Sequence, residues 1–207
     1  MSSKLFKYFN ITPNLSLKSD WVNRSFKGMV DSTGEIGKSE VLGFASRTTG
    51  SFSLNVNTQV YGLFPIRLGN IQAVRHVASP SVGYSYRPDF SKEVFGSNPN
   101  YYQAIQQDNG EVVYFDRFAG TLAGGTPKGE NQSINFSLNN VFQAKVVNGD
   151  QELKQDLFSW RLSTNKNFVS DQFQWGNLNS SIRANVQRRL NLDFSMTHDW
   201  YDYDLEN

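Results

Sequence analysis

The longest alternating stretch of the chain is residues 71–88, IQAVRHVASPSVGYSYRP. One parity is mostly apolar and aromatic and holds Val74, His76, Ala78, Pro80, Val82, Tyr84 and Tyr86. The other parity is mostly small and polar and holds Arg75, Val77, Ser79, Ser81, Gly83, Ser85 and Arg87. Because a strand turns successive side chains to opposite faces, this pattern predicts a two-faced strand. Its length, about 16 residues against roughly 5–6 in a soluble strand, is typical of an outer-membrane barrel wall.

Six further segments alternate in the same way, near residues 5–19, 50–64, 132–147, 155–168, 177–187 and 190–200. With residues 71–87 they predict an all-β chain of about seven long strands. The connections are long at 20–46 and 88–130, short at 65–70 and 148–153, medium at 169–176 and tight at 188–189. Barrel strands are joined by short turns on one side and longer loops on the other, so these lengths predict an antiparallel up-and-down meander that forms part of a transmembrane barrel.

Prolines and glycines refine this prediction. Pro80 has no N–H to donate to a ladder, so a bulge or other local irregularity is expected there. Asp108-Asn109-Gly110 predicts a hairpin inside the long connection. The glycine-rich residues 119–130 are interpreted as a flexible loop tip.

Composition narrows the class of protein. The chain has 207 residues, a net charge of +1 and no cysteine, which argues against a nucleic-acid footprint, disulfides and thiolate metal sites. It has no run of about 18 apolar residues, so no transmembrane helix is predicted. The mean hydropathy of −0.50 and the 14% aromatic content both suit a barrel with one polar face. The N-terminus lacks the apolar core of a signal peptide, and residues 1–207 are expected to be a fragment of one barrel domain.

The residues offer little for catalysis. No paired carboxylates, metal-binding motif or phosphate-binding loop occurs, so no enzyme activity, catalytic residue, cofactor or metal is predicted. The two histidines, His76 and His198, are interpreted as residues near strand ends. The predicted interior face carries a basic excess that either attracts phosphorylated lipid or pairs with acidic residues. Its candidate residues are Lys18, Arg75, Lys145, Arg161 and Arg183, against Asp193 and Asp199. Tyr84, Tyr86, Trp160 and Trp200 are the candidate interface aromatics.

One stretch resembles a known family. The combination of Arg75-His76, Pro80-Ser81 and Tyr86-Arg87-Pro88 is similar to a segment of the LptD family, the outer-membrane proteins of lipopolysaccharide (LPS) assembly, as found in Bacteroidota-like bacteria. Residues 60–65 and 133–146 resemble the strands before and after that segment. The resemblance covers roughly residues 8–203, although the alternating strands by themselves are not specific to one family.

The resemblance implies a large barrel in the bacterial outer membrane that inserts LPS into the outer leaflet. It also implies an LptE-like plug lipoprotein and periplasmic LPS-bridge proteins as partners, with outer-membrane lipid around the wall and no nucleic acid. The bridge proteins are expected to act through an N-terminal periplasmic domain, which is missing here, as is the signal peptide. Two alternatives stay open: a fragment of another outer-membrane barrel, such as a TonB-dependent receptor or porin, and a soluble carbohydrate-binding β-sandwich.

Overall fold

The computed structural model describes residues 3–5, 8–31, 34–66, 69–107, 110–148, 151–186 and 190–201. Within these ranges the secondary structure consists of strands, and no helix is long and apolar enough to cross a membrane. The strands are β1 (Ser3–Leu5), β2 (Phe9–Val30), β3 (Ile36–Asn57), β4 (Val60–Phe64), β5 (Ile71–Arg87), β6 (Tyr102–Gln106), β7 (Val112–Asp116), β8 (Asn131–Asn148), β9 (Gln151–Asn167), β10 (Leu178–Val186) and β11 (Leu190–His198).

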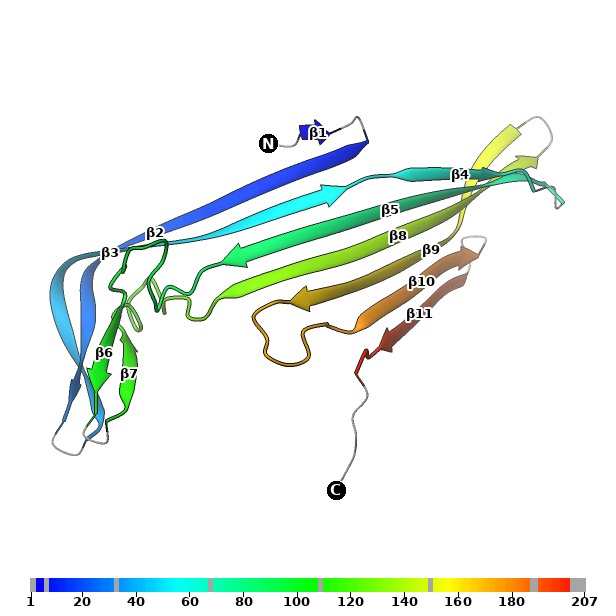
Figure 1. The fold of residues 1–207 in the computed structure, drawn as a ribbon. Helices are drawn as coiled ribbons and strands as arrows, with labels where there is room; N and C mark the ends of the chain where they lie inside the picture. Colours follow the sequence, from blue (N-terminus) through cyan, green and yellow to red (C-terminus); the bar gives the residue numbers. More distant parts are fainter. Residues whose placement is uncertain are drawn as a thin grey trace, which may run out of the picture. The chain divides into compact units, whose positions relative to one another are not determined.

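The strands form an antiparallel meander, which confirms the predicted fold class. Nine of them make one sheet in the order β1-β2-β3-β5-β8-β9-β10-β11, with β4 also paired to β5 (Figure 1). The hairpin β6–β7 forms a separate two-stranded sheet inside the connection between β5 and β8. Neighbours in the large sheet are thus near neighbours along the chain, as the predicted up-and-down order requires.

The chain divides into two compact units. Unit 1 comprises residues 1–14, 53–85 and 132–207, and unit 2 comprises residues 15–52 and 86–131. Strands β2 and β3 contribute residues to both units. Unit 1 therefore contains most of the alternating strands, and unit 2 contains the long connection together with the β2–β3 hairpin.

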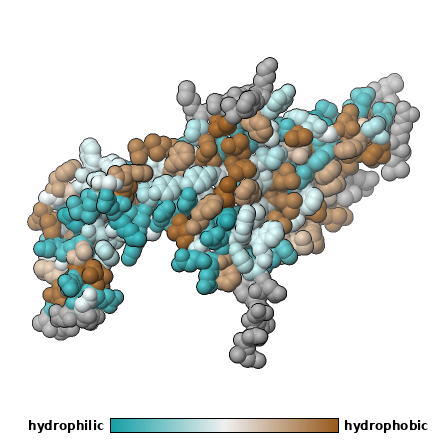
Figure 2. All heavy atoms as spheres, viewed as in Figure 1, coloured by the Kyte–Doolittle hydropathy of each residue, from teal (hydrophilic) through white to brown (hydrophobic). Residues whose placement is uncertain are grey.

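In unit 1 the strand register sorts side chains by chemistry, because residues that face each other across an antiparallel pair point to the same side of the sheet. One row holds Ser137, Ser163, Asn179 and Thr197, from four neighbouring strands. A row on the opposite side holds Phe142, Phe158, Ala184 and Leu192. These two sides are called the polar face and the apolar face below. Figure 2 shows apolar side chains gathered in bands among polar ones.

The connections of unit 1 gather at two edges. The amide of Val147, near the end of β8, donates to the carbonyl of Asn70 at 2.9 Å, so the end of the short 65–70 connection lies beside the end of β8. The amide of Phe168 donates to the carbonyl of Gln132 at 2.8 Å, so the 168–177 connection lies beside the end of the long one. Short and longer connections therefore lie at opposite ends of these strands.

The predicted loop at residues 20–46 is wrong. Strand β2 continues to Val30 and β3 begins at Ile36, with a turn closed by the Gly34 amide donating to the Asp31 carbonyl at 3.1 Å. Both strands carry many polar residues on both faces here, so alternation did not mark them. The predicted strand at 50–64 is also divided, because β3 ends at Asn57 and β4 starts at Val60. The turn residues 108–109, 149–150 and 187–189 lie outside the described residues.

The irregularity expected at Pro80 lies in the neighbouring strand. β5 runs unbroken through Pro80, whereas the β3–β4 segment breaks at residues 58–59. Val60 pairs with Ala78, and the Thr58 amide donates to the Pro80 carbonyl at 3.2 Å. A regular antiparallel pair would return a second bond from Pro80 to Thr58, which proline cannot make.

Unit 2 has its own small core, formed by the buried side chains of Phe26, Phe90, Ile105 and Phe118. Hairpin β6–β7 packs closely on Gly28, where a Cβ atom would lie 2.3 Å from Ile105 Cδ1. The Gln103 side chain accepts from the Gly28 amide and donates to its carbonyl. The hairpin is thus fixed to β2 through the backbone of one glycine.

The glycine-rich segment is held in place, so its interpretation as a flexible tip is wrong. Arg47 of β3 is only 2% exposed and donates to the carbonyls of Ala123 and Gly124 and to the hydroxyl of Thr126. Its guanidinium also pairs with Asp20 of β2 at 2.7 Å. One buried side chain therefore joins two strands to a segment more than seventy residues further along the chain.

Candidate functional site

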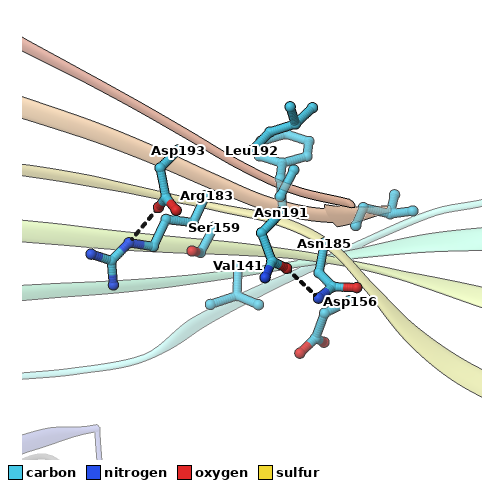
Figure 3. Close-up of a pocket in the computed structure, with 11 residues that line it drawn as sticks. Val141, Asp156, Ser159, Arg183, Asn185, Asn191, Leu192 and Asp193 are labelled. Carbon is cyan, nitrogen blue, oxygen red and sulfur yellow. Dashed lines mark hydrogen bonds and ion pairs between the residues drawn. The ribbon is translucent and has the colours of Figure 1, made fainter. Parts of the chain in front are cut away.

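Charged side chains on the polar face of unit 1 are the first part of the candidate site. Arg183 of β10 and Asp193 of β11 face each other in register, and their side chains pair at 2.9 Å. Two residues further, Asn185 donates to Asn191 at 2.6 Å. Figure 3 shows both pairs on one side of the strands. They line a shallow concavity of about 400 Å³ together with Asp156 and Ser159.

A local irregularity shapes this concavity. The β8–β9 register shifts between Phe142 and Gln143, so Phe142 faces Phe158 while Gln143 faces Asp156. Leu157 is therefore the extra residue of a β-bulge, and it lines the same hollow. Bulges bend a strand and increase its local twist, which accounts for a concavity at this place.

Three of the five predicted basic residues have acidic partners. Besides Arg183, Lys145 pairs with Glu152 at 2.6 Å, and Lys18 of unit 2 pairs with Asp20 at 3.0 Å. The Lys145–Glu152 pair is exposed, so it contributes little to stability but removes net positive charge locally. Asp20 is mostly buried and is shared between Lys18 and Arg47. Pairing thus accounts for much of the basic excess seen in the sequence.

Arg75 and Arg161 have no carboxylate within ion-pair distance among the described residues. The Arg75 guanidinium lies over the Tyr61 ring, 4.9 Å from its centroid, on a strand pair that places it opposite Leu63. Arg161 is exposed and faces Asn139 and Ser181 in the register of the polar face. Of the five predicted basic residues, these two are therefore the ones without an acidic partner among the described residues.

The family-motif residue His76 lies on the apolar face, as its parity predicted. Its Nε2 is 2.9 Å from Asn140 Oδ1, and its ring stacks on Phe142 with centroids 4.4 Å apart. Phe142 in turn stacks on Phe158 at 4.4 Å. A polar pair therefore sits within a column of stacked rings that spans β5, β8 and β9.

Asn140 interrupts the alternation of residues 132–147 but was not among the predicted site residues. It is 5% exposed, and its amide also donates to the Trp160 carbonyl at 3.3 Å. The Trp160 indole donates to the Ser180 hydroxyl at 2.8 Å. A buried amide on an apolar face is costly unless it is satisfied, and here the partners come from neighbouring strands. The signal in the sequence was a single polar residue, Asn140, on an otherwise apolar parity.

The other motif residues have separate environments. The Ser81 hydroxyl is 2.7 Å from the Ser137 hydroxyl on the polar face of unit 1. Arg87, in unit 2, donates to the Gly129 carbonyl at 3.3 Å, while Tyr86 and Pro88 of the same unit are partly exposed. The motif is therefore a set of structural positions along one strand, and its residues do not converge on one point.

The candidate interface aromatics of unit 1 differ in position. The Tyr84 hydroxyl accepts from Gln132 at 2.9 Å, near the end of β5. Trp200 donates to the Gly176 carbonyl at 3.0 Å and contacts His198 edge to face, beside the 168–177 connection. Trp160 instead lies in the middle of β9, in the row of Asn140. Their placement at a membrane boundary stays a prediction.

Two groups in the long connection of unit 2 have shifted acidities. Burial raises the pKa of Asp89, but hydrogen bonds from Ser91 and from the Gly129 amide outweigh it, so the pKa falls below its ordinary value. Burial raises the pKa of Tyr102, whose hydroxyl donates to the Thr126 carbonyl at 2.7 Å. Both side chains form hydrogen bonds to residues later in the same connection, Asp89 with Gly129 and Tyr102 with Thr126. They have no geometry suited to catalysis.

Comparison with known proteins gives one finding. A family model described as "LptD protein" matches residues 1–201 of the chain. No curated protein and no solved structure matches significantly. The match extends over both units and over all eleven described strands.

Proposed function

This chain belongs to the LptD protein family, and on that basis we propose that it forms part of the wall of an outer-membrane barrel that delivers LPS to the outer leaflet. The observation that carries the proposal is a sheet whose strand register separates a polar from an apolar face. On the apolar face of β11, Leu192, Phe194 and Met196 are 51%, 60% and 54% exposed. Large exposed side chains in continuous rows suit contact with lipid, because water disfavours them.

Backbone pairing supports the same proposal. A segment inside a bilayer must satisfy its amides and carbonyls within the protein, and a continuous antiparallel sheet does so for every inner strand. Four polar side chains in the middle of the apolar face are also satisfied within the protein, since His76 pairs with Asn140 and Trp160 with Ser180. These polar atoms are thus not left to lipid.

The polar face lines the interior in this proposal. Its Ser and Asn rows offer hydrogen bonds without net charge, and Arg75 and Arg161 are the two predicted basic residues there without an acidic partner among the described residues. The phosphorylated sugar headgroup of LPS is anionic, so these two guanidiniums are the residues proposed to attract it as it passes. Lys145 and Arg183 pair with carboxylates on this face, add no net charge and are not proposed to contact the headgroup.

The partners follow from the same family. We propose an LptE-like plug lipoprotein within the barrel, and periplasmic LPS-bridge proteins that deliver the substrate. Of the alternatives, a β-sandwich needs two sheets packed face to face, whereas the described strands form one large sheet and a hairpin. A TonB-dependent receptor or porin is disfavoured by the family match.

The test replaces Arg75 and Arg161 in the full-length protein. Arg75→Gln with Arg161→Gln should reduce the rate at which LPS reaches the surface by roughly tenfold, the lower end of electrostatic steering effects. A matched control, Arg183→Gln with Asp193→Asn, removes an already neutral ion pair and should leave the rate unchanged. Barrel assembly is checked by the mobility of unheated protein on gels. Normal LPS export by an assembled Arg75/Arg161 variant would contradict the role of these residues.

A further inference from the structure

Unit 2 carries an exposed apolar surface that the proposed conduit does not use. Trp21, Leu42, Phe44 and Leu122 are 75%, 80%, 76% and 101% exposed, and they are called the Trp21 patch here. The rings of Trp21 and Phe44 lie edge to face, 6.3 Å apart. Trp21, Leu42 and Leu122 also line one open hollow of about 580 Å³. Three separate segments of unit 2 therefore place large apolar side chains together.

The position of Leu122 is built into the fold. Its neighbour Thr121 is buried and donates to the Phe118 carbonyl at 2.8 Å, and the Gly124 amide returns to the Thr121 carbonyl. On the other side, Arg47 holds the carbonyls of Ala123 and Gly124. A turn fixed on both sides presents a fully exposed leucine, so its exposure does not arise from a loose loop.

The chemistry of the patch matches a lipid surface. Trp21 has an apolar ring body and an indole N–H that donates to Ser19 at 3.1 Å, and such amphipathic rings favour the boundary between headgroups and acyl chains. On the same side of β2, Leu15 and Leu17 are 67% and 69% exposed and extend the apolar strip. Gly50 of β3 leaves the space that the Leu17 side chain occupies.

The rim of the hollow also suits an interface with headgroups. Arg24 and Glu40 pair at 3.1 Å, are about half exposed and line the same hollow as Trp21. We propose that the Trp21 patch docks on the outer lipid surface, with Trp21, Phe44, Leu42 and Leu122 at the level of the headgroups. This inference rests on the proposed placement of the chain in the outer membrane. It assigns a membrane-anchoring role to the β2–β3 hairpin and to the long connection of unit 2, to which the proposed function gives no role.

The experiment measures the depth of single tryptophans in the full-length protein, reconstituted in phosphatidylethanolamine–phosphatidylglycerol vesicles. One variant keeps Trp21 as the sole tryptophan, and a second keeps Trp160, which lies on the apolar face of unit 1. A third lacks all native tryptophans and carries Phe95→Trp. Phe95 is also in unit 2 and is 89% exposed, but it does not line the hollow. Quenching by lipids brominated at shallow and deep positions is compared with quenching by aqueous acrylamide.

The expected result is strong quenching of Trp21 by shallow brominated lipid, weak quenching by acrylamide, and the reverse for the Phe95→Trp reporter. Leu122→Ser should then increase the acrylamide quenching of Trp21 severalfold. Open access of Trp21 to acrylamide in vesicles would overturn the inference, and so would shielding from both quenchers, which would indicate a protein partner. If Trp160 is not quenched by brominated lipid, the proposed placement in the membrane fails as well. If Trp160 is quenched and Trp21 is not, only the docking inference fails.

Discussion

Arg47 gives the sharpest test of how unit 2 is held together. Its guanidinium makes four hydrogen bonds, to Asp20, Ala123, Gly124 and Thr126, and its side chain is 2% exposed. Arg47→Ala leaves a carboxylate and two carbonyls without these partners. Removing one member of a buried ion pair typically costs 3–5 kcal/mol, and the partial exposure of Asp20, at 13%, favours the low end, about 3 kcal/mol.

The same hairpin supplies the control. Arg24 and Glu40 also connect β2 to β3, but their side chains are 50% and 44% exposed. Exposed pairs contribute roughly 0.2–1 kcal/mol, so Arg24→Ala should cost about 0.5 kcal/mol. The two variants therefore share residue type and location in the hairpin but differ in burial of the ion pair and in the three further bonds that Arg47 makes.

Amide hydrogen exchange separates the two outcomes. In the segment that Arg47 holds, the Gly124 amide donates to the Thr121 carbonyl and the Thr126 amide donates to Asp116 of β7. A loss of about 3 kcal/mol should accelerate their exchange about a hundredfold, against about twofold for Arg24→Ala. Amides of β8 and β9 in unit 1 should not change, which shows that the sheet remains folded. Equal acceleration in both variants, or no acceleration in Arg47→Ala, would refute the assignment of Arg47 as the anchor of this segment.

Two further predictions concern the apolar face and the long connection. Asn140→Leu should destabilise the folded protein by about 1–3 kcal/mol in denaturant unfolding from vesicles, because the His76 ring loses its partner. Adding His76→Phe should recover part of that loss. Equal stability of the single and double variants would contradict the pairing. The pKa of Asp89 lies below 3.8, so its contribution to stability is present above that pH and is lost as pH falls through the lowered pKa. An NMR titration should show the Gly129 amide shifting below pH 3.8, and Asp89→Asn should abolish the shift.

The sequence predicted unit 1 well because its side chains obey one rule. A strand between lipid and a hydrated interior must alternate, and residues 71–87 and 132–147 do so over most of their length. The register then follows from matching faces, as Phe142 against Phe158 and Ser137 against Ser163 illustrate. The polar residue Asn140 departs from the rule, and its contact with His76 on the neighbouring strand β5 explains it.

Unit 2 was harder to predict because long-range contacts decide its structure. The anchor Arg47 directly follows the stretch predicted as a loop, and its partners in the glycine-rich segment lie 76–79 residues later. The spacing of residues in the sequence does not predict such a long-range contact. For the same reason the glycines of residues 119–130 suggested flexibility. In the structure the carbonyls of Ala123 and Gly124 accept hydrogen bonds from the buried Arg47 guanidinium.

Pro80 has a consequence for the fidelity of strand pairing. Repeated alternation leaves a sheet open to slips of two residues, because such a slip keeps every side chain on its proper face. The missing N–H at Pro80 removes this freedom, since the pairing is complete only where the facing strand has its own break at residues 58–59. A slip of two would set the proline against paired residues and cost an additional ladder bond. Pro80 thus specifies the correct register in a sheet whose other residues scarcely distinguish that register from one shifted by two residues.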